Sequence, residues 1–128
     1  MKNWNPIRDK SFDFAVRIVK FHKWLKESGA DYDLAKQVLR SGTSIGANVA
    51  EAQSGQSKKD FIHKNHIAFK EVNETIYWLN LLNKSEIISD DTANSLLKDA
   101  EELRRILASI IKTSKESIRD NIKESVQH

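Results

Sequence analysis

Apolar residues recur every three or four positions through most of the chain, and no stretch keeps the strict alternation of a half-buried strand. Few residues interrupt this pattern, since the 128 residues include four glycines and one proline. The interruptions predict helices at about 11–28, 33–54, 57–83 and 90–115 or longer. Because short connections make consecutive helices pack antiparallel, we predict an all-α fold, a left-handed, antiparallel up-down-up-down four-helix bundle forming a single domain over 1–128.

The helix ends are expected at capping residues. Asp9 or Ser11 can cap the first helix, Asp33 the second and Ser57 the third, because their short side chains accept hydrogen bonds from free backbone amides. Gly29 is expected to end the first helix, since glycine readily takes the left-handed conformation that follows many helices.

Placing each helix on a wheel of about 100° per residue assigns it a buried face. The expected core is formed by Phe14, Ala15, Ile18, Val19, Phe21, His22 and Leu25 in the first helix, Phe61, Ala68, Phe69, Val72, Ile76 and Leu79 in the third, and Ala93, Leu96, Leu97, Ala100, Leu103, Leu107, Ile110 and Ile111 in the fourth.

The apolar stripe of the fourth helix continues beyond the expected length of the bundle. Ile118, Ile122 and Val126 follow one another at four-residue spacing. A helix that reaches Val126 would extend past its neighbours by several turns. We therefore expect this tail to pack on another surface, such as a second subunit.

The second helix contains a stretch, Ser41–Ser44, whose residues are poor helix formers. The apolar period nevertheless runs through it, and Gly42 and Gly46 line up beside the apolar face. Side chains this small let a neighbouring helix approach closely, so we predict a continuous helix. A polar stripe beside this face predicts interhelical hydrogen bonds, with an ion pair of the Arg40–Glu51 type at a subunit contact; its residues are Gln37, Arg40, Ser41, Ser44, Asn48 and Glu51.

The run 37–52, QVLRSGTSIGANVAEA, resembles the signature of the small bacterial four-helix-bundle proteins, also called ribosomal RNA intervening-sequence proteins. Lys58-Lys59-Asp60-Phe61 and the stretch 71–75, EVNET, lie where that family has its lysine-rich helix start and its Asn-Glu pair. The resemblance implies a bundle that assembles into homopentameric rings. The chain is also similar to the accessory protein of diversity-generating retroelements, a pentamer whose basic surface engages RNA and a reverse transcriptase.

Composition argues against catalysis. The chain has no cysteine, no glycine-rich phosphate loop and no Ser-His-Asp set. A di-iron bundle needs two Glu-x-x-His motifs, whereas this chain offers Asp60-x-x-His63 and His63-x-x-His66 once each. We therefore expect no catalytic residues, no metal and no cofactor, and a protein that is not an enzyme.

The net charge of +3 comes from the first third of the chain, where residues 1–40 hold nine basic and five acidic side chains. Lysine and arginine neutralise phosphates, and an exposed indole can stack on a base. The alternative is a solvated face with its tryptophan at a subunit interface. The candidate nucleic-acid-binding residues are Lys10, Arg17, Lys20, Lys23, Trp24 and Lys26.

A second surface is predicted on the third helix, where Ile67 and Trp78 lie outside the core stripe and are typical of an oligomer interface. Our hypothesis is a non-catalytic homo-oligomer, an accessory to structured RNA or to a nucleic-acid enzyme. The alternative is a structural or adaptor oligomer that binds a protein without nucleic acid. The polar start of the chain and the lack of a long apolar run predict a cytoplasmic protein with no membrane partner.

Overall fold

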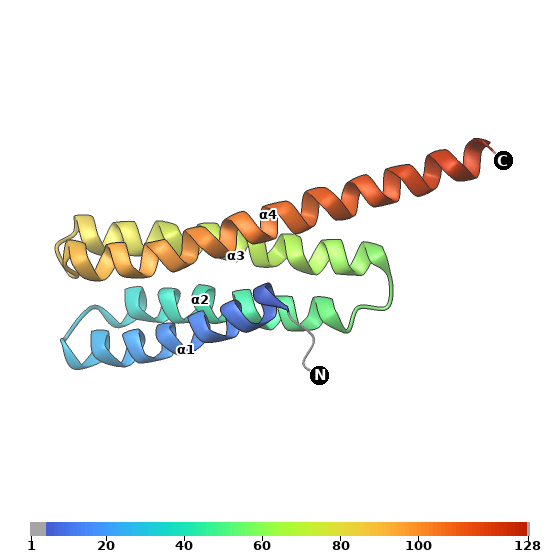
Figure 1. The fold of residues 1–128 in the computed structure, drawn as a ribbon. Coiled ribbons are helices and arrows are strands. Elements are labelled where there is room, and N and C mark those ends of the chain that lie inside the picture. Colours follow the sequence, from blue (N-terminus) through green and yellow to red (C-terminus); the bar gives the residue numbers. More distant parts are fainter. Residues whose placement is uncertain (1–4, 128) are drawn as a thin grey trace.

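The computed structural model, which describes residues 5–127, consists of four helices joined by short connections (Figure 1). They are α1 (Pro6–Glu27), α2 (Tyr32–Gln53), α3 (Lys58–Lys84) and α4 (Asp90–Gln127). Successive helices run in opposite directions, as Figure 1 shows. The predicted all-α four-helix bundle is therefore confirmed, while the handedness of the bundle stays a prediction.

The first helix begins five residues earlier than predicted, because its cap is Asn5 and not Asp9 or Ser11. The Asn5 side chain accepts a hydrogen bond from the Arg8 amide at 3.2 Å. Pro6 then occupies the first helical position, where its missing N–H costs nothing and its fixed φ fits the helix. Helix α2 likewise begins one residue early, capped by Asp31 and not by Asp33.

Ser57 caps α3 as predicted, with its hydroxyl accepting from the Asp60 amide at 3.1 Å. Gly29 follows α1 with a φ of +79°, and the Ala30 amide donates to the Leu25 carbonyl at 3.1 Å. This is the Schellman arrangement that closes a helix C-terminus. The same arrangement closes α3, but there Glu86 holds the left-handed conformation, with a φ of +63°.

The core follows the predicted stripes, with two kinds of exception. Val19 was predicted to be buried but is 51% exposed, because α1 packs closely on α2 and only loosely on α4. The second kind are positions predicted to be buried that are only half-buried, namely Ala15, His22, Phe61, Phe69, Ile76, Leu97 and Ile110. Fully or almost fully buried positions include Phe14, Ile18, Leu25, Val38, Ile45, Val49, Ala68, Val72, Leu79, Leu82, Ala100, Leu103 and Leu107.

The glycines of α2 set the spacing between α1 and α2. The α2 helix is continuous through 41–44, as predicted. A Cβ atom on Gly42 would lie 2.8 Å from both Cγ atoms of the buried Ile18, and one on Gly46 would lie 3.1 Å from the Ser11 carbonyl oxygen. Carbon atoms prefer contacts of about 3.5–4.0 Å, so the absence of these two side chains is what lets α1 lie this close.

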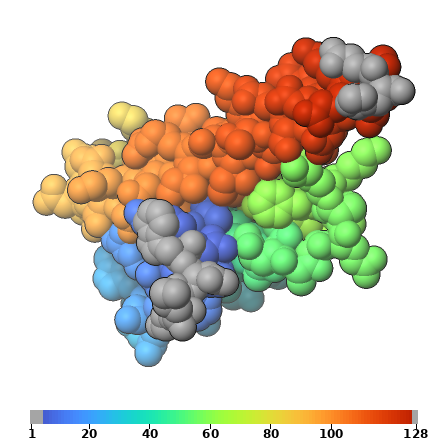
Figure 2. Space-filling view, turned by 45° about the vertical axis from the view of Figure 1, so that its right-hand side comes forward, coloured from blue at the N-terminus to red at the C-terminus, as the bar shows by residue number. Residues whose placement is uncertain are grey.

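Helix α4 extends well past the start of α3 (Figure 1). Figure 2 shows its red C-terminal part standing away from the green start of α3, with a hollow between them. Ile122 is 58% exposed and Val126 is 80% exposed. The overhang predicted from the apolar stripe is therefore present, with Ile118 half-buried and the two later apolar residues exposed on this chain.

Candidate nucleic-acid interface

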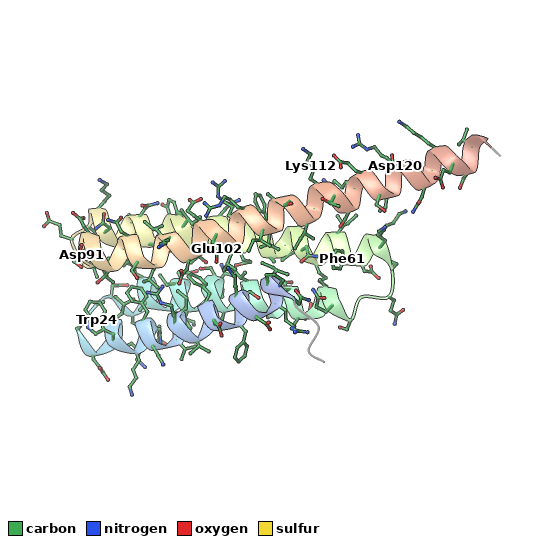
Figure 3. The ribbon with its side chains drawn as sticks, in the orientation of Figure 1. Trp24, Phe61, Asp91, Glu102, Lys112 and Asp120 are labelled. Atoms are coloured by element: carbon green, nitrogen blue, oxygen red, sulfur yellow. The ribbon has the colours of Figure 1, made fainter. Side chains whose placement is uncertain are left out.

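Four of the six predicted nucleic-acid-binding residues are exposed to solvent on the second half of α1. Lys20, Lys23 and Lys26 are exposed, and none of them has an ion-pair partner among residues 5–126. Trp24 is 46% exposed and stacks on Phe21, with ring centroids 6.0 Å apart and planes 17° apart. Phe21 thus supports one part of the indole and leaves the remainder to solvent. Figure 3 shows Trp24 at the same end of the bundle as Asp91.

The other two predicted residues, Lys10 and Arg17, hold α1 against α4. The Lys10 ammonium lies 2.8 Å from a carboxylate oxygen of Glu102, and the Arg17 guanidinium lies 2.5 Å from one of Asp99. Arg17 also donates to the Ser95 hydroxyl at 2.8 Å. Their charges are therefore largely balanced within the chain, which makes them weaker phosphate ligands than the prediction assumed.

Sequence reasoning did not identify Asp99 and Glu102 as partners. Their i, i+3 spacing places them on one face of α4, but no local signal tells which helix that face meets. Figure 3 shows Glu102 between the two layers of the bundle. A cleft of about 220 Å³ separates α1 and α4 here, and it is lined by Lys10, Asp13, Phe14, Arg17, Asp99, Glu102 and Leu103.

Three apolar side chains lie exposed on the stretch 12–19 of α1. Phe12 is 67% exposed, Val16 39% and Val19 51%. Their i, i+4, i+7 spacing places them in one stripe along the helix. Contiguous exposed apolar residues mark contact surfaces for other proteins. Sequence reasoning missed this stripe, because it assigned Val19 to the core and did not consider Phe12 and Val16.

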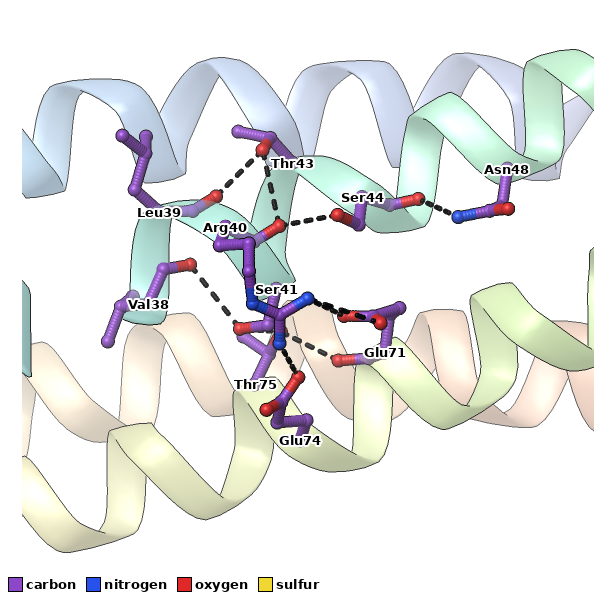
Figure 4. Close-up of polar contacts among 10 residues, drawn as sticks. All are labelled: Val38, Leu39, Arg40, Ser41, Thr43, Ser44, Asn48, Glu71, Glu74 and Thr75. Carbon is purple, nitrogen blue, oxygen red and sulfur yellow. Dashed lines mark hydrogen bonds and ion pairs between the residues drawn. The ribbon is translucent and has the colours of Figure 1, made fainter. Parts of the chain in front are cut away.

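The polar stripe of α2 meets α3 within the chain (Figure 4). Arg40 forms ion pairs with both Glu71 and Glu74, at 3.2 Å from Glu71. The Thr75 hydroxyl donates to the buried Ser41 hydroxyl at 3.0 Å. The predicted interhelical hydrogen bonds are thus present, and an ion pair of the Arg40–Glu51 type at a subunit contact stays a prediction.

The remaining residues of the stripe also have partners in this chain or lie partly covered. Glu51 pairs with Lys64 of α3 at 2.7 Å. Ser44 and Asn48 bond to carbonyls one turn earlier in α2, at 2.6 and 2.8 Å, as serine and asparagine in helices often do. Gln37 is half-buried. The stripe accordingly joins α2 to α3, and a subunit contact through it stays a prediction.

The pKa of Glu71 is raised above its usual value. Burial is the main cause, because Glu71 is half-covered by α2 and α3 and its charged form loses hydration. The neighbouring Arg40 opposes this rise, and Glu74 adds to it. Arg40 therefore offsets much of the cost of placing two carboxylates side by side on α3.

Ile67 and Trp78 are less exposed than predicted. Both are half-buried, and Trp78 packs against the hydrophobic core because α3 lies between α2 and α4. The Trp78 indole Nε1 is fully covered and has no hydrogen-bond partner among the described residues. The neighbouring Tyr77, whose ring meets the Trp78 ring edge-on at 5.1 Å, is 60% exposed instead. Trp78 thus contributes mainly to the stability of its own bundle.

The described residues offer neither a cluster of metal ligands nor a membrane-spanning helix. Within residues 5–126 no three His, Asp or Glu side chains come together in a way that could hold a metal ion. His63 is exposed, and His66 stacks on Phe69 with ring centroids 6.4 Å apart. None of the four helices, over the part of the chain that is described, combines the length and apolar character needed to cross a membrane.

The fold and these surfaces define an all-α four-helix bundle with a buried apolar core and additional polar contacts between its helices. Residues 5–109 match the family model for the 23S rRNA-intervening sequence protein, and the chain belongs to this family, as the resemblance implied. It is also similar to a crystal structure from Bacteroides thetaiotaomicron, described as a protein with unknown function from the S23 ribosomal protein family. The two are 50% identical with a TM-score of 0.81, and the match covers 83% of this chain and 98% of that one. No curated protein matches the sequence.

Proposed function

We propose that this chain is a non-catalytic, homo-oligomeric accessory protein of the cytoplasm that associates with structured RNA through the second half of α1. The observation that carries this proposal is the set of exposed, unpaired Lys20, Lys23 and Lys26 beside the half-exposed Trp24.

The geometry suits a phosphate backbone better than a small ligand. Lys20 and Lys26 lie about 9 Å apart along the helix axis, at about 1.5 Å per residue. Neutralising phosphates releases counterions, so each lysine adds affinity without requiring a shaped pocket. The Trp24 indole can add stacking on an unpaired base, which is worth about 1–3 kcal/mol.

Oligomerisation would strengthen such binding. One copy offers three cations, which is a small site, but a ring presents the same site several times to one RNA. The resemblance implies five copies. The stripe of Phe12, Val16 and Val19 precedes the lysines along α1 and offers an apolar surface for a neighbouring subunit. Subunit contact and RNA contact would then occupy successive stretches of one helix.

Fluorescence anisotropy with a labelled RNA hairpin at several salt concentrations tests the proposal. We expect binding that weakens steeply with salt, and Lys20→Glu/Lys23→Glu to weaken it at least about tenfold and to reduce the salt slope by about 2. Lys98→Glu, at an exposed lysine of α4, is the matched control and should change little. Trp24→Ala should lower affinity while leaving the salt slope unchanged. Undetectable or salt-independent binding would contradict the proposal.

The exposed stripe on α1 favours a second candidate, an adaptor oligomer that binds protein and no nucleic acid. Phe12, Val16 and Val19 expose more apolar surface than an isolated bundle requires. Val16→Asp should lower the sedimentation mass, because it places a charge in the subunit contact, while the circular dichroism stays helical. An oligomer that needs Val16 and shows no affinity for RNA would establish this second function in place of the first.

A further inference from the structure

The overhanging end of α4 lies outside the part of the chain that the family shares. The family match ends at residue 109, and the related crystal structure is covered over 98% of its length by 83% of this chain. The segment 112–126 continues as regular helix beyond this point. In Figure 3, Asp120 lies past Phe61, near the start of α3, and therefore outside the four-helix part of the bundle.

One side of this overhang forms an apolar groove with the start of α3. The groove has a volume of about 580 Å³. Ile118, Ile122 and Val126 supply its apolar wall, and Ser57, Lys58 and Lys59 stand opposite. The Lys58 ammonium donates to the Ser117 hydroxyl at 2.5 Å, which ties the two walls together at one end. Figure 2 shows this hollow between the red and green parts of the molecule.

The groove is bordered by positive charge on both sides. On α4 a row of four basic residues, which begins at Lys112 and continues at i+3, i+7 and i+11, follows one side of the apolar stripe. Lys58 and Lys59 lie on the opposite wall of the groove. The N-terminus of α3 adds its partial positive charge at the same place. None of these cations forms an ion pair within the described part of the chain. The row is formed by Lys112, Lys115, Arg119 and Lys123.

We propose that this groove binds an acidic amphipathic helix of a partner protein, with the partner's apolar residues against Ile118, Ile122 and Val126 and its carboxylates facing Lys115, Arg119 and Lys58. The argument is charge complementarity. An apolar stripe between rows of unpaired cations fits a helix whose apolar stripe is bordered by Asp and Glu. The site differs from the α1 surface and does not depend on it.

Two other occupants fit the groove less well. A second copy of the overhang, packed antiparallel, would place its own Lys112–Lys123 row against the identical row, because like flanks meet across a twofold axis. An RNA strand would find cations but no aromatic side chain to stack on, since 110–126 contains none. A lipid surface would meet few large apolar residues, since the stripe on this short helix consists of Ile118, Ile122 and Val126.

The test uses a fluorescein-labelled synthetic peptide of about 18 residues, long enough to span the overhang at about 1.5 Å per residue. It carries leucines at i, i+3 and i+4 spacing with glutamates on both flanks. A control peptide replaces every glutamate by lysine. We expect the full-length protein to bind the acidic peptide at least about tenfold more tightly than the basic one, with affinity that falls as salt increases.

Two variants locate the binding site. Ile122→Asp and Lys115→Glu/Arg119→Glu should each weaken binding of the acidic peptide at least about tenfold. Tyr32→Asp and Lys98→Glu, which make matched changes at exposed positions elsewhere, should not. All of these positions are exposed, so circular dichroism should show unchanged helix content.

Three results would overturn the proposal. One is equal or absent binding of the two peptides, and another is binding that the groove variants leave unchanged. The third is a sedimentation mass that falls with Ile122→Asp while the acidic peptide does not bind, since that outcome would assign the groove to a second copy of this chain. Failure of RNA binding to α1 would leave the proposal intact, because the two surfaces are tested with different probes and variants.

Discussion

The close contact between Gly42 and Ile18 gives the sharpest prediction about this fold. Replacing glycine by alanine inside an exposed helix stabilises it by about 1 kcal/mol, because the unfolded chain loses conformational freedom. At Gly42 the added Cβ would lie 2.8 Å from both Cγ atoms of Ile18. Ile18 is fully buried and β-branched, so it cannot turn away into another rotamer at low cost. Overpacking of this kind costs about 1–3 kcal/mol.

We therefore expect Gly42→Ala to leave the protein unchanged in stability or less stable by up to about 2 kcal/mol. The double variant separates the two contributions. Ile18→Ala removes both Cγ atoms, at a cost of about 2–5 kcal/mol, and in that background Gly42→Ala should become stabilising by up to about 1 kcal/mol, since only the Cβ of residue 18, at 3.2 Å, remains close. The change of sign corresponds to a coupling free energy of about 1–3 kcal/mol between the two positions.

Urea unfolding followed by circular dichroism at 222 nm measures each free energy, at one fixed protein concentration because oligomerisation would shift the transition. Ala47→Gly calibrates the helix-propensity contribution, since Ala47 is exposed on the same helix. It should cost about 1 kcal/mol. If Gly42→Ala alone stabilised the protein by that same amount, the helices would not be in the close contact described, and the role assigned to the small residues of α2 would be refuted.

Three further predictions concern polar groups and one strained residue. Arg40→Gln should destabilise the protein by about 1 kcal/mol at pH 7 and by less at pH 4.5. Because the pKa of Glu71 is raised, the stability of the protein falls as pH rises through that pKa, and the loss of Arg40 raises the pKa further. Urea unfolding at both pH values checks this prediction, and equal losses of stability would contradict it. Thr75→Val should lower the free energy of unfolding by about 1 kcal/mol in the same assay, since the buried Ser41 hydroxyl loses its donor. An unchanged urea midpoint would show that the hydrogen bond between the two hydroxyls does not stabilise the protein. Glu86→Gly should stabilise the protein by about 0.5–1 kcal/mol and raise its Tm by a few degrees, because glycine adopts the φ of +63° without steric cost. A lower Tm would show that Glu86 is not strained at this position.

Two buried polar atoms of α3 without a hydrogen-bond partner among the described residues lower the stability of the bundle. Asn65 is fully buried, and its side-chain amide donates to the Phe61 carbonyl at 3.0 Å. Its side-chain oxygen and the Trp78 Nε1 have no partner among the described residues. A buried polar atom without a hydrogen-bond partner costs about 1–3 kcal/mol of stability, and α3 has two such atoms. In α1 the only buried polar residue in the described range is Ser11, whose hydroxyl donates to the Arg8 carbonyl.

The number of helices, their order and most of the core follow from the pattern of residues along the chain. A period of three to four residues is a local property, and it survives the poor helix formers at Ser41–Ser44 because burial of Val38, Ile45 and Val49 outweighs their propensity cost. The family also follows from the sequence, since the run 37–52 carries its signature. The same period of three to four residues places the lysines of α1 on the exposed side of that helix.

Which charges lack an ion-pair partner depends on how the helices pack in three dimensions. Lys10 and Arg17 resemble Lys20 and Lys23 in sequence, yet the first two meet Glu102 and Asp99 across the bundle and the others meet solvent. Partners more than 80 residues apart leave no local trace, because the angle of each helix about its axis and its distance from the next are set by packing of the whole core. The same packing covers Trp78, exposes Val19 and leaves the end of α4 open beside the start of α3.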